Sequence, residues 1–249
     1  MTAQLRSELF KQRTTRTTLG LVLAMVVLVA AVILLHVVAL PTQGLTGRQG
    51  QLKVLGLGTT FGMIFGSLLG ALSITTEIRN GMIRPTLLAM PNRSRVVAAK
   101  VMACLIAGAA LGLFSEAIAV GMGAAGLAAR GIQIAPSVGD FAQLLVGGAA
   151  AAALWAAIGV GIGATLRNQV GAAISLVVWL LFIEMTVIGV APAVGKFLPG
   201  ASGGALAGAM LQETATYLLV PAVGALLMVA YAALAIGAGL VTTARRDIN

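Results

Sequence analysis

Long apolar segments separated by short polar ones make up most of the chain. Six apolar runs each have the length of a membrane-crossing helix: 18–40, 54–76, 101–129, 141–166, 170–191 and 214–243. At about 1.5 Å per helical residue, the first run alone reaches about 34 Å and exceeds a hydrocarbon core of roughly 30 Å. The pattern predicts an all-α membrane protein with six transmembrane helices in a single domain, residues 1–249.

Composition and charge support this prediction. Of the 249 residues 59% are hydrophobic and 9% charged, whereas about a quarter of a soluble domain is charged. The net charge of +9 resides in the gaps between apolar runs, so we interpret the cations as topology signals and expect no nucleic-acid partner. With both termini cytoplasmic, twelve Lys and Arg lie inside and four outside. We therefore expect a multi-pass membrane protein, and since an Ala- and Gly-rich chain is compatible with a bacterial source, we expect the bacterial inner or plasma membrane.

The segment before the first span, residues 1–17, is basic and carries Leu5, Leu9 and Phe10 near one helical face. This arrangement predicts an amphipathic helix lying on the inner membrane surface. An ordinary basic flank of a membrane helix is an equally good interpretation.

Small residues predict how the spans pack. Gly58, Gly62, Gly66 and Gly70 recur every four residues in the second span and form one stripe, along which another helix backbone can approach closely. The third run exceeds one perpendicular crossing, so we expect a tilt or a break near Gly121. The connection 192–213 is too long for a turn and too apolar for a solvated loop, which favours short re-entrant or interfacial helices.

Two carboxylates fall inside predicted spans. Glu116 and Glu184 each lie 16 residues, or about 24 Å, beyond the inner end of a span. A carboxylate at that depth is costly unless it faces a cavity, is protonated or has a partner. They are candidates for a translocation path or gate. The alternative is a structural role, in which they hydrogen-bond neighbouring helices or cap the re-entrant segment.

The motifs that an ATPase or a metalloenzyme needs are absent from the sequence. The pattern G-x-x-x-x-G-K-[ST] does not occur, and Gly195-Lys196 is followed by Phe197 instead of a hydroxyl. His36 is the single histidine and Cys104 the single cysteine, so we expect no metal site. The sequence predicts a chain that is not an enzyme and binds no cofactor of its own.

The longest polar interruption runs from residue 77 to residue 100, with five cations and one anion. This excess predicts a cytoplasmic loop. Its motif comprises Glu77, Gly81, Leu87, Leu88, Pro91, Arg95 and Lys100. The arrangement resembles the loop after the second span in type-2 ATP-binding-cassette (ABC) transporter permeases, with Met82 where threonine is usual.

The resemblance implies that two permease subunits, identical or different, form the path, and that each docks an ABC ATPase subunit through a short coupling helix. ATP and Mg²⁺ would then be bound by two copies of the partner. Pro85 can start such a helix. Leu87 and Leu88 could enter a groove on the ATPase while Arg79 and Arg84 meet its acidic rim. The alternative is a solvated loop that only fixes topology.

The expected function is therefore that of a permease subunit in an exporter driven by ATP. The apolar interior favours a hydrophobic or amphipathic substrate such as a drug, an antibiotic, a peptide or a lipid. Two alternatives are a non-transporting membrane component of a sensing or resistance complex, and an ion-coupled secondary transporter that uses Glu116 or Glu184 as its proton site.

Overall fold

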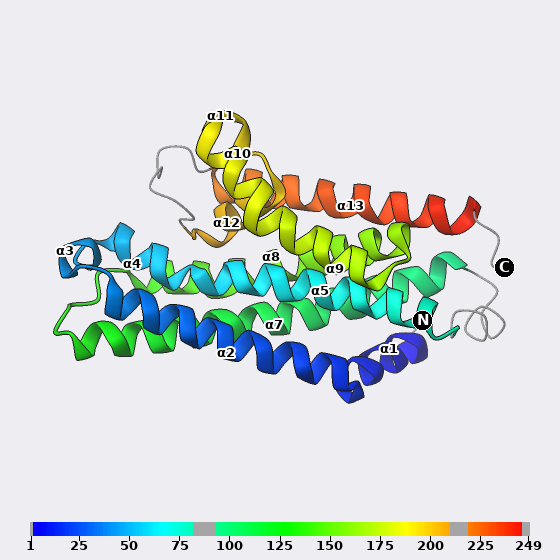
Figure 1. Cartoon of the computed structure of the whole chain (residues 1–249), viewed down its shortest axis with the longest axis horizontal. Coiled ribbons are helices and arrows are strands. Elements are labelled where there is room, and N and C mark those ends of the chain that lie inside the picture. Colours follow the sequence, from blue (N-terminus) through cyan, green and yellow to red (C-terminus); the bar gives the residue numbers. More distant parts are fainter. Residues whose placement is uncertain (1, 82–92, 210–218, 246–249) are drawn as a thin grey trace.

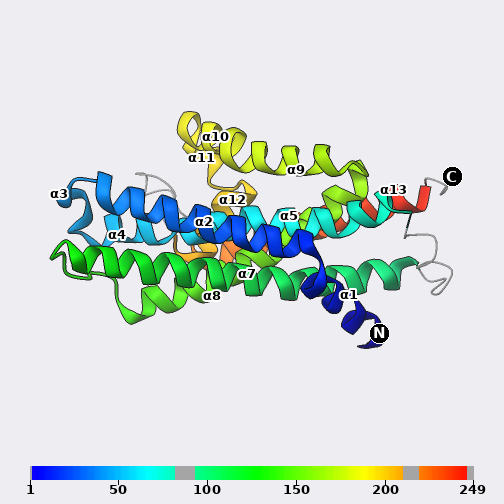
Figure 2. The same cartoon turned by 60° about the horizontal axis from the view of Figure 1, so that its bottom comes forward.

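A computed structural model describes residues 2–81, 93–209 and 219–245 of the chain. Within these ranges the structure is helical and contains no strand. Figures 1 and 2 show a bundle that is elongated along its helix axes, with the first helix, α1 (Thr2–Thr14), at the same end as the C-terminal end of the last. The prediction of an all-α fold is confirmed.

Six helical segments are long and apolar enough to cross a membrane, and each overlaps one predicted run. They indicate a multi-pass membrane protein. The segments are α2 (Arg16–Ala39), α4 with α5 (Arg48–Leu55 and Leu57–Arg79), α7 (Arg93–Ala129), α8 (Val138–Leu166), the continuous series α9, η1 and α10 (Gln169–Val178, Trp179–Ile183 and Glu184–Val190) and α13 (Pro221–Arg245).

The centre of the bundle is the pair α5 and α8. Helix α5 also packs against α2, α7 and α9, and α8 against α7 and α13. Each glycine of the predicted stripe faces another helix. A Cβ on Gly70 would overlap the carbonyl oxygen of Ala156, and one on Gly66 would lie 2.6 Å from that of Ala152, whereas Gly58 and Gly62 face α7. Backbones therefore touch along this seam, as in other membrane helix pairs that lack large side chains.

The segment between the first two spans is helical rather than a simple polar gap. It forms α3 (Thr42–Leu45) and α4, which leads into α5. The fully buried side chain of Gln51 holds this segment in place. Its amide nitrogen donates to the carbonyl oxygens of Leu45 and Gln133, at 2.9 and 2.8 Å, and its oxygen accepts from the Ala135 N–H at 2.9 Å. These bonds tie α4 to the connection between α7 and α8.

Helix α7 is one helix of 37 residues with no break near Gly121, so of the two alternatives for the third run the tilt stays a prediction. It also starts at Arg93, so the last part of the predicted 77–100 loop, up to Lys100, is helical. The charges of this stretch predict a loop, but the partners of Lys100 described below let this residue lie inside a helix.

Two short helices follow the fifth span, α11 (Pro192–Gly195) and α12 (Pro199–Ala207). Short helices are therefore present in 192–213, whose last residues, 210–213, lie outside the described part, and their re-entrant or interfacial position stays a prediction. The sixth helix is described from Pro221 onward, later than the predicted start at 214. The proline at its first position fits there because an N–H at that position would have no partner within the helix.

Candidate functional site

Helix α1 meets the ends of α5 and α7 through four charged residues, Glu8, Lys11, Glu77 and Lys100, which we call the ion cluster. Lys100 Nζ lies 2.7 Å from Glu8 Oε2 and 3.1 Å from Glu77 Oε1. Lys11 Nζ lies 2.8 Å from Glu8 Oε1 and 2.9 Å from Glu77 Oε1. Each ammonium thus bridges both carboxylates, and the cluster joins three helices.

The ion cluster is mostly withdrawn from water. The side chains of Lys100 and Glu8 are each 4% exposed and that of Glu77 is 11% exposed, whereas Lys11 is 39% exposed. A buried ammonium is costly unless it is paired and hydrogen-bonded. Lys100 meets this condition with two carboxylates and the carbonyl oxygen of Ser73, at 3.3 Å. Two positive and two negative charges leave the cluster neutral.

The electrostatics of α1 follow from these contacts. Burial raises the pKa of Glu8, but the Lys100 and Lys11 ammonium groups outweigh it, so the pKa of this carboxyl lies below its usual value of 4.5. Burial likewise lowers the pKa of Lys11, and its hydrogen bonds to Glu8 and Glu77 outweigh that effect and raise it above 10.5. Both groups are therefore held in their charged forms at neutral pH.

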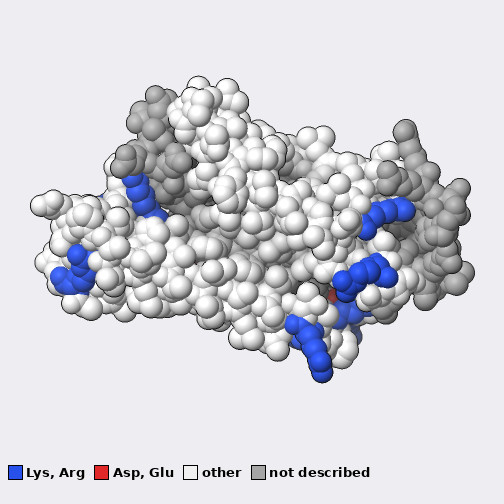
Figure 3. Space-filling model, viewed as in Figure 1, with Lys and Arg blue, Asp and Glu red and all other residues white. Residues whose placement is uncertain are grey.

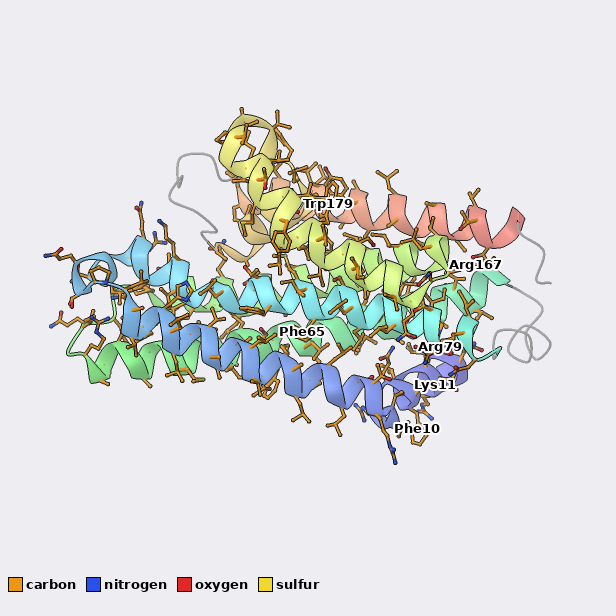
Figure 4. All side chains as sticks on the ribbon, viewed as in Figure 1. Phe10, Lys11, Phe65, Arg79, Arg167 and Trp179 are labelled. Carbon is orange, nitrogen blue, oxygen red and sulfur yellow. The ribbon has the colours of Figure 1, made fainter. Side chains whose placement is uncertain are left out.

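The face of α1 that contacts the bundle is polar. Glu8 is buried, and the Gln12 amide reaches Cys104 Sγ at 3.6 Å. Phe10 is 67% exposed and points away from the bundle (Figure 4). The predicted helix is present; of its three apolar residues Phe10 is exposed and Leu5 and Leu9 are half-buried, and the contacts of the helix with α5 and α7 include the ion pairs of Glu8 and Lys11.

The predicted coupling-loop residues fall into three groups. Glu77 and Lys100 meet in the ion cluster. Arg79 is exposed at the end of α5, and Gly81 follows with a φ of 67°, which only glycine adopts without strain. The remainder lie outside the described residues (Arg84, Pro85, Leu87, Leu88 and Pro91) or on α7 with an undescribed side chain (Arg95).

Cations gather at the end of the molecule that carries α1. Figure 3 shows several Lys and Arg side chains there and fewer at the opposite end. Figure 4 places Lys11, Arg79 and Arg167 at that end, on three different elements. At the same end of the molecule the described chain stops at residue 81, after α5, and resumes at residue 93, where α7 begins.

Glu116 is fully buried between α5, α7 and α8. Its Oε2 accepts a hydrogen bond from Thr59 Oγ1 at 2.9 Å, and its Oε1 has no hydrogen-bond partner among the described residues. Gly58 on α5 and Gly148 on α8 leave the space that the carboxyl occupies. The group lies in a helix contact, with room made for it by residues that lack a side chain.

Glu184 is tied to the short helix α12. Its Oε1 accepts from the Ala201 N–H at 2.7 Å and its Oε2 from Trp179 Nε1 at 3.1 Å. Trp179 begins η1, a wide π-helical turn that ends just before Glu184. A carboxylate at a helix N-terminus satisfies free N–H groups. This geometry fits the structural alternative, and it accounts for the burial of Glu184 without a role in transport.

Among the described residues, no three His, Cys, Asp or Glu side chains lie close enough together to hold a metal ion. The Nδ1 of His36 lies 2.8 Å from the carbonyl oxygen of Val32 in its own helix. Cys104 is buried, and its thiol contacts Ser73 Oγ at 3.3 Å. Both residues have contacts that suit packing within the bundle.

Sequence reasoning missed two pairings. Glu8 is the only acid within residues 1–17, three residues before Lys11, and this spacing was an available signal for an ion pair on one helical face. At the other end of the bundle Arg48 Nε donates to Asp140 Oδ2 at 2.9 Å, and Asp140 also takes part in a capping box with Ser137. No local pattern connects Arg48 with a residue 92 positions away.

No protein-family model and no curated protein matches the chain.

Proposed function

We propose that this chain is the membrane-spanning subunit of an exporter driven by ATP, of the type-2 ABC class, and that it moves a hydrophobic or amphipathic substrate. The observation that carries the proposal is the ion cluster. It brings together the first and last residues of the loop motif, Glu77 and Lys100, and attaches α1 to both of them.

The cluster suits the transmission of movement from a partner. Residues 82–92 connect two helices whose ends are held together, so a force on this segment would act on α5 and α7 at once. Through Glu8 and Lys11 the same force would reach α1. Helix α5 would carry it along the close-packed seam with α8 into the centre of the bundle. A dimer of two such chains could then rock between two arrangements.

In this proposal the end of the bundle that carries α1 faces the cytoplasm of a bacterial cell, because that end is rich in cations. Two copies of a separate ATPase subunit bind ATP and Mg²⁺ and dock against residues 82–92. Exposed Arg79 offers a cation beside this segment for an acidic rim on the partner.

The test is purification of the tagged chain from its native membranes, followed by measurement of ATP hydrolysis in the purified complex. A partner ATPase that copurifies with the wild type should be lost with Leu87→Asp and with Arg84→Glu. Val138→Asp and Lys53→Glu introduce the same two acids, again at an apolar and a basic residue, near the other end of the bundle and should keep the partner. Undiminished ATPase recovery with the first two variants would count against docking at this segment.

A second candidate is an ion-coupled transporter, which is favoured by the complete burial of Glu116 beside a single hydroxyl partner. A carboxyl in such a place can exchange a proton if another conformation exposes it. Transport in vesicles distinguishes the two. Uptake or efflux that survives loss of ATP, collapses with a protonophore and disappears in Glu116→Gln would replace the first proposal.

A further inference from the structure

A cavity of about 330 Å³ lies beside the ion cluster, between α1, α2, α5 and α7. This volume is at the small end of the range of ligand sites in proteins. Its wall includes exposed Thr14, Thr15 and Thr17 at the junction of α1 and α2, so it reaches the molecular surface there. None of the functional roles discussed above uses this space.

The cavity changes from apolar to polar along its length. On α5 its lining residues run from Leu69 and Leu72 to Thr76, and Asn80, the C-cap of this helix, continues the same face, over about 16 Å in all. On α2 the lining residues likewise change from apolar Leu21 to polar Thr18 and Thr17 toward α1. The deep end thus suits hydrocarbon and the end near α1 suits a polar group, as an amphiphile requires.

The polar end is rich in hydrogen-bond donors. The hydroxyls of Thr17, Thr18 and Thr76 and the amide of Asn80 make no hydrogen bond to another described residue. Lys11 has three N–H donors and uses two of them on Glu8 and Glu77. The two carboxylates of the wall are already paired with lysines. Such a surface favours a ligand that mainly accepts hydrogen bonds.

Charge outside the cavity favours an anion. Arg13, Arg16 and Arg79 are exposed and adjoin lining residues in the sequence. Basic pockets of this kind at the membrane surface bind lipid head groups.

From these observations we propose that the cavity binds the phosphate group of an anionic membrane lipid. The phosphate oxygens accept from Thr17, Thr18, Thr76 and Lys11, and one acyl chain follows Leu21, Leu69 and Leu72. The inference requires only a membrane-embedded bundle, so it stands whether or not the chain works with an ATPase.

The test is native mass spectrometry of the full, delipidated chain titrated with dioleoyl phosphatidylglycerol and, separately, with dioleoyl phosphatidylcholine. Both lipids offer a phosphate, but the trimethylammonium group of phosphatidylcholine cancels its charge and is repelled by Lys11 and the exposed arginines, so we expect the anionic lipid to bind about tenfold more tightly. The triple variant Thr17→Val, Thr18→Val and Thr76→Val should weaken phosphatidylglycerol binding about tenfold. Equal affinity for the two lipids, or an unchanged triple variant, overturns the proposal.

A matched control changes two threonines elsewhere. Thr165→Val and Thr186→Val remove hydroxyls that only bond to their own helices, and lipid affinity should stay at the wild-type value. A loss of affinity as large as that of the triple variant would overturn the assignment to this cavity. Arg16→Glu provides a second route if the triple variant does not fold, because Arg16 is exposed and an acid suits the first turn of α2. It should weaken phosphatidylglycerol binding, whereas Lys196→Glu should not, and equal effects would overturn the proposal.

A separate titration distinguishes a lipid from free phosphate, which shares the same chemistry. Inorganic phosphate at millimolar concentration should leave bound phosphatidylglycerol in place, because the acyl chain contributes to affinity. Displacement of the lipid by phosphate, together with binding of phosphate alone, would overturn the lipid assignment.

Discussion

Two stretches of α5 hold it to the bundle in opposite ways. Between Gly58 and Gly70 it contacts α7 and α8 through glycines, with backbone against backbone. At Glu77 it contacts α1 and α7 through charged side chains. Backbone contacts tolerate no added atom, whereas lysine and glutamate side chains have several rotatable bonds. The comparison suggests a rigid seam within the membrane and an adjustable joint at its end.

The largest effect is expected at the seam, from Gly70→Ala. The added Cβ would overlap the Ala156 carbonyl oxygen on α8, and neither backbone can move without its helix. Overpacking of this kind costs about 3 kcal/mol. Thermal unfolding in detergent should show a large drop in midpoint. Gly121→Ala is the control, because no atom lies within 4 Å of its added Cβ. Equal midpoints for the two variants would contradict a rigid seam.

A smaller loss is expected at the joint, from Lys100→Met. This change leaves two carboxylates with one cation, and the uncompensated charge should cost about 2 kcal/mol, because Lys11 still contacts both acids. Adding Glu8→Gln should recover part of the loss, since the excess negative charge falls. Thermal midpoints of the single and double variants measure this. A double variant less stable than Lys100→Met would contradict the pairing.

The next smaller loss of stability is expected when one hydrogen bond inside the seam is removed. Thr59→Val removes the donor to the buried carboxyl of Glu116 and should cost about 1.5 kcal/mol. The neighbouring Thr60→Val is a matched control, because the buried hydroxyl of Thr60 has no partner among the described residues and its loss should be neutral or stabilising. Denaturation of both variants in detergent tests the difference, and equal stability would remove Thr59 from the account of Glu116.

The smallest change in stability is expected from a change of pH, and it arises from the charged groups of the joint, Glu8 and Lys11. The pKa of Glu8 lies below 4.5, so its contribution to stability is complete above that value and is lost as pH falls through the lowered pKa. For Lys11, whose pKa is raised above 10.5, the contribution is lost only as pH rises through that raised value. Thermal midpoints from pH 7 to pH 3 should fall less in Glu8→Gln than in the wild type. Parallel curves would place the acid sensitivity elsewhere.

The seam was open to prediction from the sequence because a four-residue period is a local signal. Gly66 and Gly70 face α8 as such a stripe requires, although the sequence could not tell which helix they meet. The spans were predictable for the same reason, since length and hydropathy are properties of one segment. Their ends were not, because a helix such as α7 continues past its apolar part wherever charges find partners.

The joint could not be predicted in the same way. Glu8 and Lys100 are separated by 92 positions, and nothing in either neighbourhood points to the other. Lys100 was expected to mark the end of a loop, and its burial depends on an acid supplied by α1. For Glu184 the sequence predicts a cap of the segment 192–213 as one alternative, and the hydrogen bond from the Ala201 N–H fits it, but no pattern indicates the second bond, from Trp179.

The wide turn η1 has a consequence for chain length. A π turn holds one residue more than an α turn, so every side chain after it is rotated by about 100° relative to an uninterrupted helix. That rotation sets the direction of Glu184, the next residue. If the same residues formed a regular helix, the carboxyl would be turned by that angle away from α12, whereas deletion of one residue within 180–183 would remove the turn and leave the carboxyl in its present direction. The direction of Glu184 therefore depends on the extra residue in the π turn as much as on the identity of the side chain.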